Sequence, residues 1–313
     1  MKSTIKSYFI LSLTLCLINT GALNAQIKLQ PKELSKENMV IPVSVKDEQD
    51  VKEMVEHFLM IAGNYDIDAM SKLMTTNANI GISRYKEGNW NTETKTVQEF
   101  INSVKDKAKK PYYETISQFN ITLSEGRLAF VKADAIIYSY GLPVTQVADF
   151  FTLIKENDNW KFLSLSFTSK PIAAEKAVYD AKMFAKGYAQ AWGSQKPDFV
   201  ASFFTESGTL KVNNGDPAKG YSAISKVAEG FMTACPNMTV TMDSLSTTAK
   251  GTTFKWTLKG TNTGPKGTGK QVQISGFEQW KLSDTGLIME STGSYDKLEY
   301  ERQLKNGFGT TNK

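Results

Sequence analysis

Apolar residues recur at helical spacing in two segments of this chain, and each segment ends at a glycine. The first segment runs from Asp47 to Gly63, with Val51, Met54, Val55, Phe58, Leu59 and Ala62 at the apolar positions. The second runs over 173–192 and ends at Gly193, with Val178, Ala181, Phe184, Tyr188 and Trp192 at the apolar positions. This 3.6-residue period predicts two amphipathic helices, each with one buried face. Their glycine stops lie 130 residues apart.

The elements that follow each helix repeat in the same order. A short helix over 68–75 aligns with 198–205 at the same offset, and a third helix is expected around 97–101 and around 222–227. The period then changes from helix to strand, because apolar residues alternate over 129–137, 147–155 and 160–168, and again over 254–258, 272–282 and 287–295. The pattern predicts two tandem copies of one α+β domain, each with three helices packed on an antiparallel sheet.

The repeat sets the predicted domain boundaries. We expect an N-terminal linker over 26–45, a first domain over 46–169, a second domain over 173–305 and a tail over 306–313. Pro171 separates the last strand of the first copy from the first helix of the second.

The first 25 residues are typical of a secretory signal. Lys2 and Lys6 precede an apolar run of 11 residues over 8–18, and Leu23-Asn24-Ala25 is typical of a signal-peptidase cleavage site that ends in a small residue. A membrane-spanning helix needs about 20 apolar residues, so this run is too short to be an anchor. We expect residues 1–25 to be removed and the protein to be exported, to the periplasm or outside the cell.

Composition excludes several classes of protein. Removing the signal takes two lysines away and lowers the net charge from +5 to +3, which is a poor match for nucleic-acid binding. One cysteine, Cys235, remains, so no internal disulfide can form in the mature chain. Stability must therefore come from apolar burial, and 41% hydrophobic residues can supply it in two domains.

Three passages of the second half resemble a known family, and they are 184–193, 259–264 and 284–304. Over 173–305 the chain resembles the SnoaL-like polyketide cyclases, within the nuclear transport factor 2-like superfamily. The first half resembles the superfamily by element order alone, and we expect it to be degenerate. The resemblance implies a cone-shaped α+β roll, in which a curved antiparallel sheet wraps a long helix and the open end admits a small apolar or cyclic molecule. Members include cyclases, ketosteroid isomerases, dehydratases and domains without activity.

Three carboxylates of the second half are the candidates for acid/base chemistry. Alternation places Glu278 in the apolar stripe of the strand over 272–282. In the next strand it places Glu290 and Asp296 on one face with Ile288. The resemblance implies that Asp296 is the general acid/base. Burial would raise the pKa of such a carboxyl toward the range where it can exchange protons.

Each carboxylate also has a structural interpretation. Glu278 could pair with Lys255 or Lys259 on the neighbouring strand, and Glu290 could be an ordinary rim carboxylate. Asp296 precedes a helical segment and could be its N-cap, where backbone donors would lower the pKa. The two roles of Asp296 therefore predict opposite pKa shifts.

Other residues bear on binding and on cofactors. Tyr188 and Trp256 are the aromatic residues expected to touch a ligand, and Asn262 stands where many relatives have a histidine. His57 is the only histidine, so a zinc site is not expected, and neither a phosphate loop nor another cofactor motif is present.

The sequence thus leaves two functions open. One is a cofactor-independent isomerase, cyclase or lyase acting on a small apolar or cyclic molecule in the second domain. The other is a non-catalytic ligand-binding or interaction module, with homodimer formation or domain–domain pairing possible in either case. At an offset of 127, Glu278, Glu290 and Asp296 lie over Phe151, Leu163 and Ser169, so we expect the site in the second half.

Overall fold

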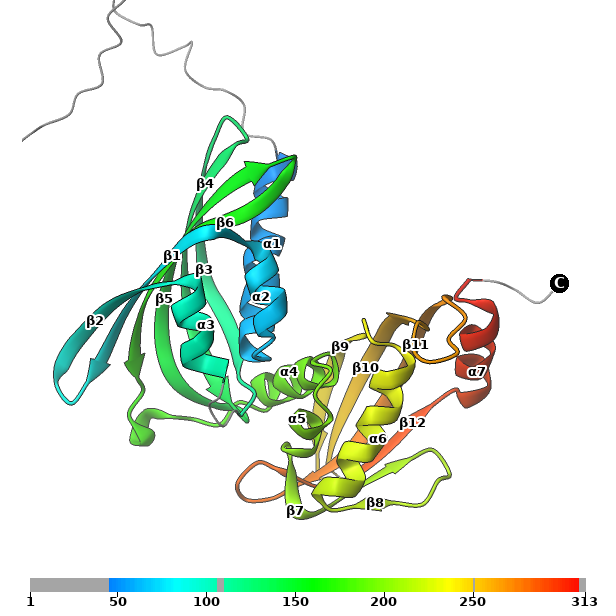
Figure 1. The fold of residues 1–313 in the computed structure, drawn as a ribbon. Helices are drawn as coiled ribbons and strands as arrows, with labels where there is room; N and C mark the ends of the chain where they lie inside the picture. Colours follow the sequence, from blue (N-terminus) through cyan, green and yellow to red (C-terminus); the bar gives the residue numbers. More distant parts are fainter. Residues whose placement is uncertain (1–44, 106–109, 250, 310–313) are drawn as a thin grey trace, which may run out of the picture. The chain divides into compact units, whose positions relative to one another are not determined.

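A computed structural model describes residues 45–105, 110–249 and 251–309, and in it the chain forms two six-stranded mixed sheets, each with its own helices (Figure 1). The predicted signal over 1–25, nearly all of the predicted linker and the end of the predicted tail lie outside the described residues. No described helix is long and apolar enough to cross a membrane.

The first sheet has the strand order β2-β1-β6-β5-β4-β3. Helix α1 packs on β3 and β6, and α3 packs on β1 and β2. The elements are α1 (Val45–Gly63), α2 (Ile67–Leu73), β1 (Met74–Lys86), β2 (Asn89–Thr96), α3 (Val97–Lys105), β3 (Tyr113–Ser124), β4 (Leu128–Ser139), β5 (Leu142–Glu156) and β6 (Asn159–Pro171).

The second sheet repeats this order as β8-β7-β12-β11-β10-β9. Helix α4 packs on β9, α6 on β7 and β8, and α7 on β11. The elements are α4 (Ala181–Trp192), α5 (Pro197–Ala201), β7 (Phe204–Val212), β8 (Ala218–Lys219), α6 (Tyr221–Ala234), β9 (Thr239–Thr248), β10 (Gly251–Thr261), β11 (Gln271–Leu282), β12 (Ile288–Tyr295) and α7 (Lys297–Asn306).

The predicted fold class, two tandem α+β domains, is confirmed, with one difference in the sheets. Strand β1 pairs with β6 in parallel, and β7 pairs with β12 in the same way, so the sheets are mixed. Parallel neighbours need a long connection, and here a hairpin, a helix and three further strands separate the two partners.

The first helix of the second domain begins later than the apolar pattern predicts. Helix α4 starts at Ala181, because the Asp180 carboxylate accepts hydrogen bonds from the backbone nitrogens of Lys182 (2.8 Å) and Met183 (3.1 Å) and caps it. Val178, which the pattern places on the buried face, is 76% exposed. The predicted helix over 173–180 is therefore wrong.

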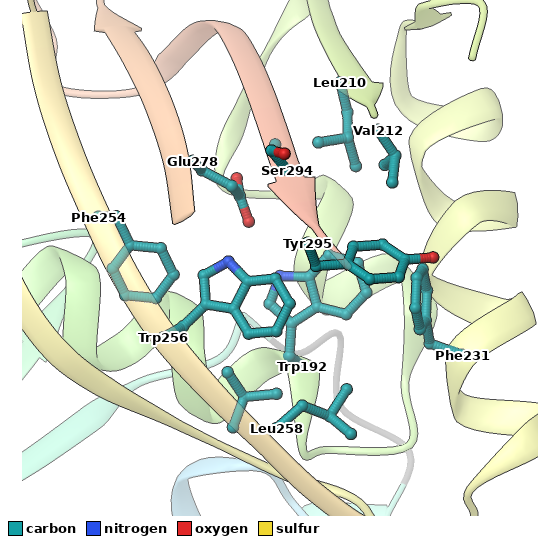
Figure 2. Close-up of a pocket in the computed structure, with 12 residues that line it drawn as sticks. Trp192, Leu210, Val212, Phe231, Phe254, Trp256, Leu258, Glu278, Ser294 and Tyr295 are labelled. Carbon is teal, nitrogen blue, oxygen red and sulfur yellow. The ribbon is translucent and has the colours of Figure 1, made fainter. Parts of the chain in front are cut away.

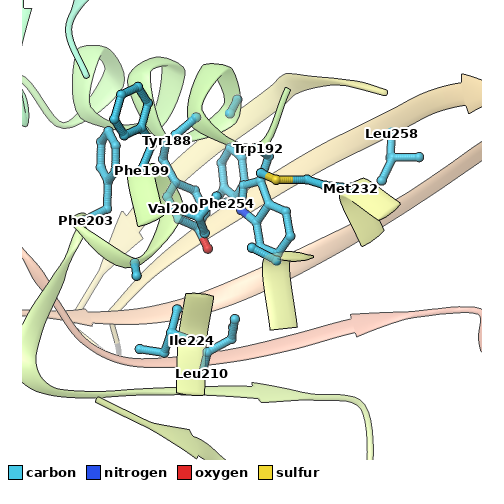
Figure 3. Close-up of a cluster of buried hydrophobic side chains, with 14 of the residues drawn as sticks. Tyr188, Trp192, Phe199, Val200, Phe203, Leu210, Ile224, Met232, Phe254 and Leu258 are labelled. Atoms are coloured by element: carbon cyan, nitrogen blue, oxygen red, sulfur yellow. The ribbon is translucent and has the colours of Figure 1, made fainter. Parts of the chain in front are cut away.

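The core of the second domain is rich in aromatic side chains from α4 and the sheet (Figure 3). Tyr188 of α4 has edge-to-face contacts with Phe203, Phe254 and Trp280 at ring-centroid distances of 5.3–5.7 Å. Such pairs add about 0.5–1.5 kcal/mol each beyond the burial of their area. They hold the helix rigidly against the sheet at the place where a carboxylate is buried.

Candidate functional site

Glu278 is a buried carboxylate in the middle of strand β11. Its neighbours across the sheet are Phe254 on β10 and Gly293 on β12. The predicted alternation along β11 is confirmed, because Val272, Ile274, Glu278 and Trp280 are all buried and the residues between them are less so. Glu278 is 5% exposed.

Three donors converge on one oxygen of Glu278. Its Oε2 atom accepts hydrogen bonds from Ser291 Oγ (2.6 Å), Trp280 Nε1 (2.9 Å) and Tyr188 Oη (3.1 Å). Its Oε1 atom has one long contact, 3.4 Å from Tyr188 Oη. Both lone pairs of Oε2 are thus used, so a proton on this carboxyl belongs on Oε1.

The pKa of Glu278 reflects two opposing effects. Burial raises it, and the hydrogen bonds from Ser291, Trp280 and Tyr188 lower it, with a net rise. No lysine contributes, since Lys255 faces Phe277 across the strand pair and Lys259 faces Gln273. The hypothesis of a lysine partner for Glu278 is therefore wrong. Burial and the nearby carboxylate also raise the pKa of Tyr188 well above its ordinary value, so Tyr188 acts as a donor.

Glu278 lines a small apolar cavity of about 40 Å³ inside the second domain (Figure 2). The other lining residues come from α4, α6 and four strands and are mostly aromatic or aliphatic: Trp192, Leu210, Val212, Phe231, Val240, Phe254, Trp256, Leu258, Gly293, Ser294 and Tyr295. This volume holds about three or four water molecules at about 10–15 Å³ each. Pockets for drug-sized ligands measure about 300–1,000 Å³.

The Trp256 side chain is one of the large groups that keep this cavity small. A Cβ atom at Gly276 would lie 2.5 Å from the Trp256 ring, so glycine is needed there for the indole to lie over the sheet. The Trp256 Nε1 atom is buried and has no hydrogen-bond partner among the described residues. Buried donors of this kind are rare in native proteins, so the N–H of Trp256 is available for a ligand oxygen.

Asp296 does not line this cavity. It is exposed, and its Oδ1 atom accepts a hydrogen bond from the backbone nitrogen of Glu299 at 2.9 Å. It is the N-cap of α7, which was one of the two roles considered for it.

Glu290 lies on the outer side of the sheet, where it forms an exposed ion pair with Lys281 at 2.6 Å. The predicted common face of Ile288, Glu290 and Asp296 is wrong. The register of β12 shifts between Ile288 and Glu290, and one extra residue exchanges the two faces beyond it. Buried positions after the bulge are Ser291 and Gly293.

Of the three remaining predicted residues, Tyr188 and Trp256 lie at the site and Asn262 lies in a loop. Tyr188 binds Glu278, and Trp256 lines the cavity. Asn262 does neither, because its Nδ2 atom donates to Leu304 O (3.0 Å) and Thr268 Oγ1 (3.2 Å) and ties the loop after β10 to the end of α7.

Ser291 is the site residue that the sequence pattern misses most clearly, since alternation without the bulge puts it on the outer face. Tyr295 was missed for the same reason. The described residues contain no group of three His, Cys, Asp or Glu side chains placed to hold a metal ion.

The fold and this site define an α+β domain with an internal cavity and one buried carboxylate. Residues 182–304 match the family model of the SnoaL-like polyketide cyclases. The resemblance of the second domain to that family is thus confirmed. A comparison with curated proteins finds no match.

Several solved structures are similar to part of this chain. A Catenulispora acidiphila protein with a ketosteroid isomerase-like fold, solved with trimethylamine, is 17% identical and covers 37% of this chain and 87% of its own, with a TM-score of 0.33. A putative polyketide cyclase from Bacillus cereus is 18% identical over 42% and 85%, with a TM-score of 0.35. A putative SnoaL-like cyclase from Jannaschia is 15% identical over 38% and 86%, with a TM-score of 0.34.

Proposed function

We propose that the second domain binds a small carbonyl compound in the Glu278 cavity and that Glu278 transfers a proton on it. The observation that carries this proposal is the asymmetry of the carboxyl group. Three donors hold Oε2, while Oε1 has only a long contact at 3.4 Å in an apolar cavity. A carboxyl with a raised pKa and one available oxygen is suited to take and return a proton.

Trp256 supplies the second part of the site. Its unpartnered Nε1–H can donate to the carbonyl oxygen of the ligand, where negative charge develops when a neighbouring carbon loses a proton. Glu278 Oε1 accepts that proton and returns it to another carbon of the same molecule. The reaction class is then isomerisation, or a cyclisation or elimination that begins with the same step, and it needs no cofactor.

The cavity limits the size of the ligand. At about 40 Å³ it takes a molecule of a few heavy atoms or the end of a larger one. The apolar walls favour a hydrocarbon body, in line with the small apolar molecule predicted from the sequence.

Proton exchange into small ketones tests this proposal. The mature protein is incubated in D₂O with acetone, cyclopentanone and cyclohexenone, and deuterium at the carbon next to the carbonyl is followed by NMR. We expect exchange above the buffer rate in the wild type and its loss in Glu278→Gln. Glu290→Gln, which removes an exposed carboxylate, is the matched control and should exchange like the wild type.

A non-catalytic binding module is the second candidate, and the aromatic filling of the cavity favours it. In that case the ketones would bind without exchange, and native mass spectrometry of the purified protein would show a co-purified molecule. Exchange that Glu278→Gln leaves unchanged would exclude Glu278 as the acid/base.

Export and self-association also belong to this proposal. Lys2, Lys6 and the apolar run after them support removal of a signal after Ala25. Mass spectrometry of the mature N-terminus in cell fractions tests export, and sedimentation tests homodimer formation.

A further inference from the structure

The first domain holds a cavity of about 290 Å³, which is larger than the cavity around Glu278. This volume is close to the lower end of the usual range for ligand pockets, about 300–1,000 Å³. Its wall includes five aromatic residues, Phe58, Tyr65, Phe100, Tyr112 and Phe167. Nothing in the repeat alignment predicted a site here.

Two carboxyl groups lie in the wall of this cavity. Glu114 comes from β3 and Asp149 from β5, with β4 between these strands. Asp149 is 4% exposed. The Glu114 Oε1 and Asp149 Oδ2 atoms are buried, and apart from the two carboxyl groups themselves no donor from the described residues reaches either of them.

The two carboxyl groups interact directly, and they can do so only through a proton. Burial raises the pKa of Glu114 well above its ordinary value, and Asp149 raises it further by its charge and by the hydrogen bond between them. Burial likewise raises the pKa of Asp149 to about 7, while the bond from Glu114 works against this rise. At neutral pH the pair therefore holds at least one proton and carries up to one negative charge.

Among the described residues, that negative charge has no counter-ion inside the cavity. Arg84 is the one cationic residue among the described residues of the lining. Its guanidinium is half exposed, forms an ion pair with Glu93 at 3.1 Å and lies over the Phe167 ring at 5.4 Å. Asp134 on β4 also raises the pKa of Asp149, and the charges of the pair raise the pKa of the buried Tyr112, so neither neighbour is a cation.

We propose that this cavity is a binding site for a small organic ammonium ion, held between the Glu114–Asp149 pair and the aromatic wall. An ammonium group supplies the N–H donors that no other described residue offers the two carboxyl groups, and the charge that balances the pair. Aromatic faces attract cations in addition. An anion would be repelled, and a neutral alcohol offers one donor and no charge.

The site was hidden from the repeat alignment for two reasons. At the offset of 127, Asp149 lies over Gly276, whose missing side chain makes room for Trp256 in the second domain. Glu114 belongs to β3, a strand whose weak alternation the sequence pattern does not reveal. On this proposal the first domain carries chemistry of its own rather than a degenerate copy of the second site.

Binding of benzylamine tests the proposal, with benzyl alcohol as its neutral counterpart. Calorimetric titrations use the mature protein at pH 8 and pH 5, since benzylamine is a cation at both. We expect benzylamine to bind at pH 8 and benzyl alcohol to bind at least about tenfold more weakly, as a charge-assisted hydrogen bond is worth that much. Lowering the pH to 5 should weaken benzylamine binding by about tenfold or more, because the pair then takes up its second proton.

Variants locate the site. Asp149→Asn should weaken benzylamine binding at pH 8 by about tenfold or more. Asp158→Asn, which removes an exposed carboxylate of the β5–β6 turn, should bind like the wild type. If Asp149→Asn does not fold, as judged by circular dichroism, Glu114→Gln replaces it. The proposal is overturned if benzylamine does not bind at millimolar concentration, if benzyl alcohol binds equally well, or if neither variant weakens binding.

Discussion

Replacing Asp149 by asparagine should stabilise the first domain, and only at neutral and alkaline pH. The folded-state pKa of Asp149 is raised from 3.8 to about 7. Below pH 4 the carboxyl is protonated in both folded and unfolded chains, so its stabilising contribution is fully present there. Between pH 4 and 7 the unfolded chain loses the proton and the folded domain keeps it, so the free energy of unfolding falls as the pH rises.

The magnitude follows from the difference between the two pKa values. About three pH units at 1.36 kcal/mol each give about 4 kcal/mol of lost stability above pH 7. Asparagine does not ionise and avoids this loss. It also removes the charge that raises the pKa of Glu114, which acts in the same direction. We therefore expect Asp149→Asn to unfold with nearly the wild-type free energy at pH 4 and to be more stable by up to about 4 kcal/mol at pH 8.

Urea unfolding followed by hydrogen-exchange mass spectrometry measures this in the first domain alone. Peptides from β4 and β5 report on the domain that contains Asp149, and peptides from β10 and β11 provide an internal reference. Asp158→Asn is the charge-matched control, since its side chain is 95% exposed. An equal dependence of stability on pH in the wild type and in Asp149→Asn would refute the reasoning.

Two further predictions concern the second domain. Asp296→Ala should lower the free energy of unfolding by about 1 kcal/mol, because it removes the cap of α7, and it should leave proton exchange into ketones unchanged. A large loss of exchange in a folded variant would support the acid/base role that the family resemblance implies. Trp256→Ala should lower the free energy of unfolding by about 3 kcal/mol in urea titrations and reduce proton exchange into cyclohexenone, because it removes the N–H that donates to the carbonyl oxygen, and unchanged exchange would show that Trp256 does not bind that oxygen.

The long periodic elements could be predicted from the sequence, and the edge strands could not. Helix α1 and strands β4, β5, β10 and β11 carry a strong apolar period because one face of each is buried. The pattern missed β2, β3, β8 and β9, which lie at or near the sheet edges. In β2 seven of its eight residues are exposed, so there is no buried face to produce alternation.

The candidate site was predicted in part. Of the predicted residues, Glu278 and Trp256 line one cavity and Tyr188 donates to Glu278, because alternation along β10 and β11 and the helical period of α4 give the direction of their side chains. Ser291 could not be found, since the bulge in β12 has no clear sign in the sequence. The family resemblance implied that Asp296 is the acid/base, but in the structure Asp296 caps helix α7, the other role considered for it.

The sequence by itself determined that there are two copies of one α+β domain, since a repeated order of helical and alternating periods allows few other folds. It also determined that Glu278 lies among apolar neighbours, because alternation fixes the face of a strand. Only the tertiary structure decided what each cavity contains. Trp256 forms part of the wall of the second domain's cavity. In the first domain, Glu114 and Asp149 lie together in the cavity wall, although they come from strands separated by β4. Which side chains share a cavity depends on their volumes and on which strands pair in the sheet. Neither property produces a periodic pattern in the sequence.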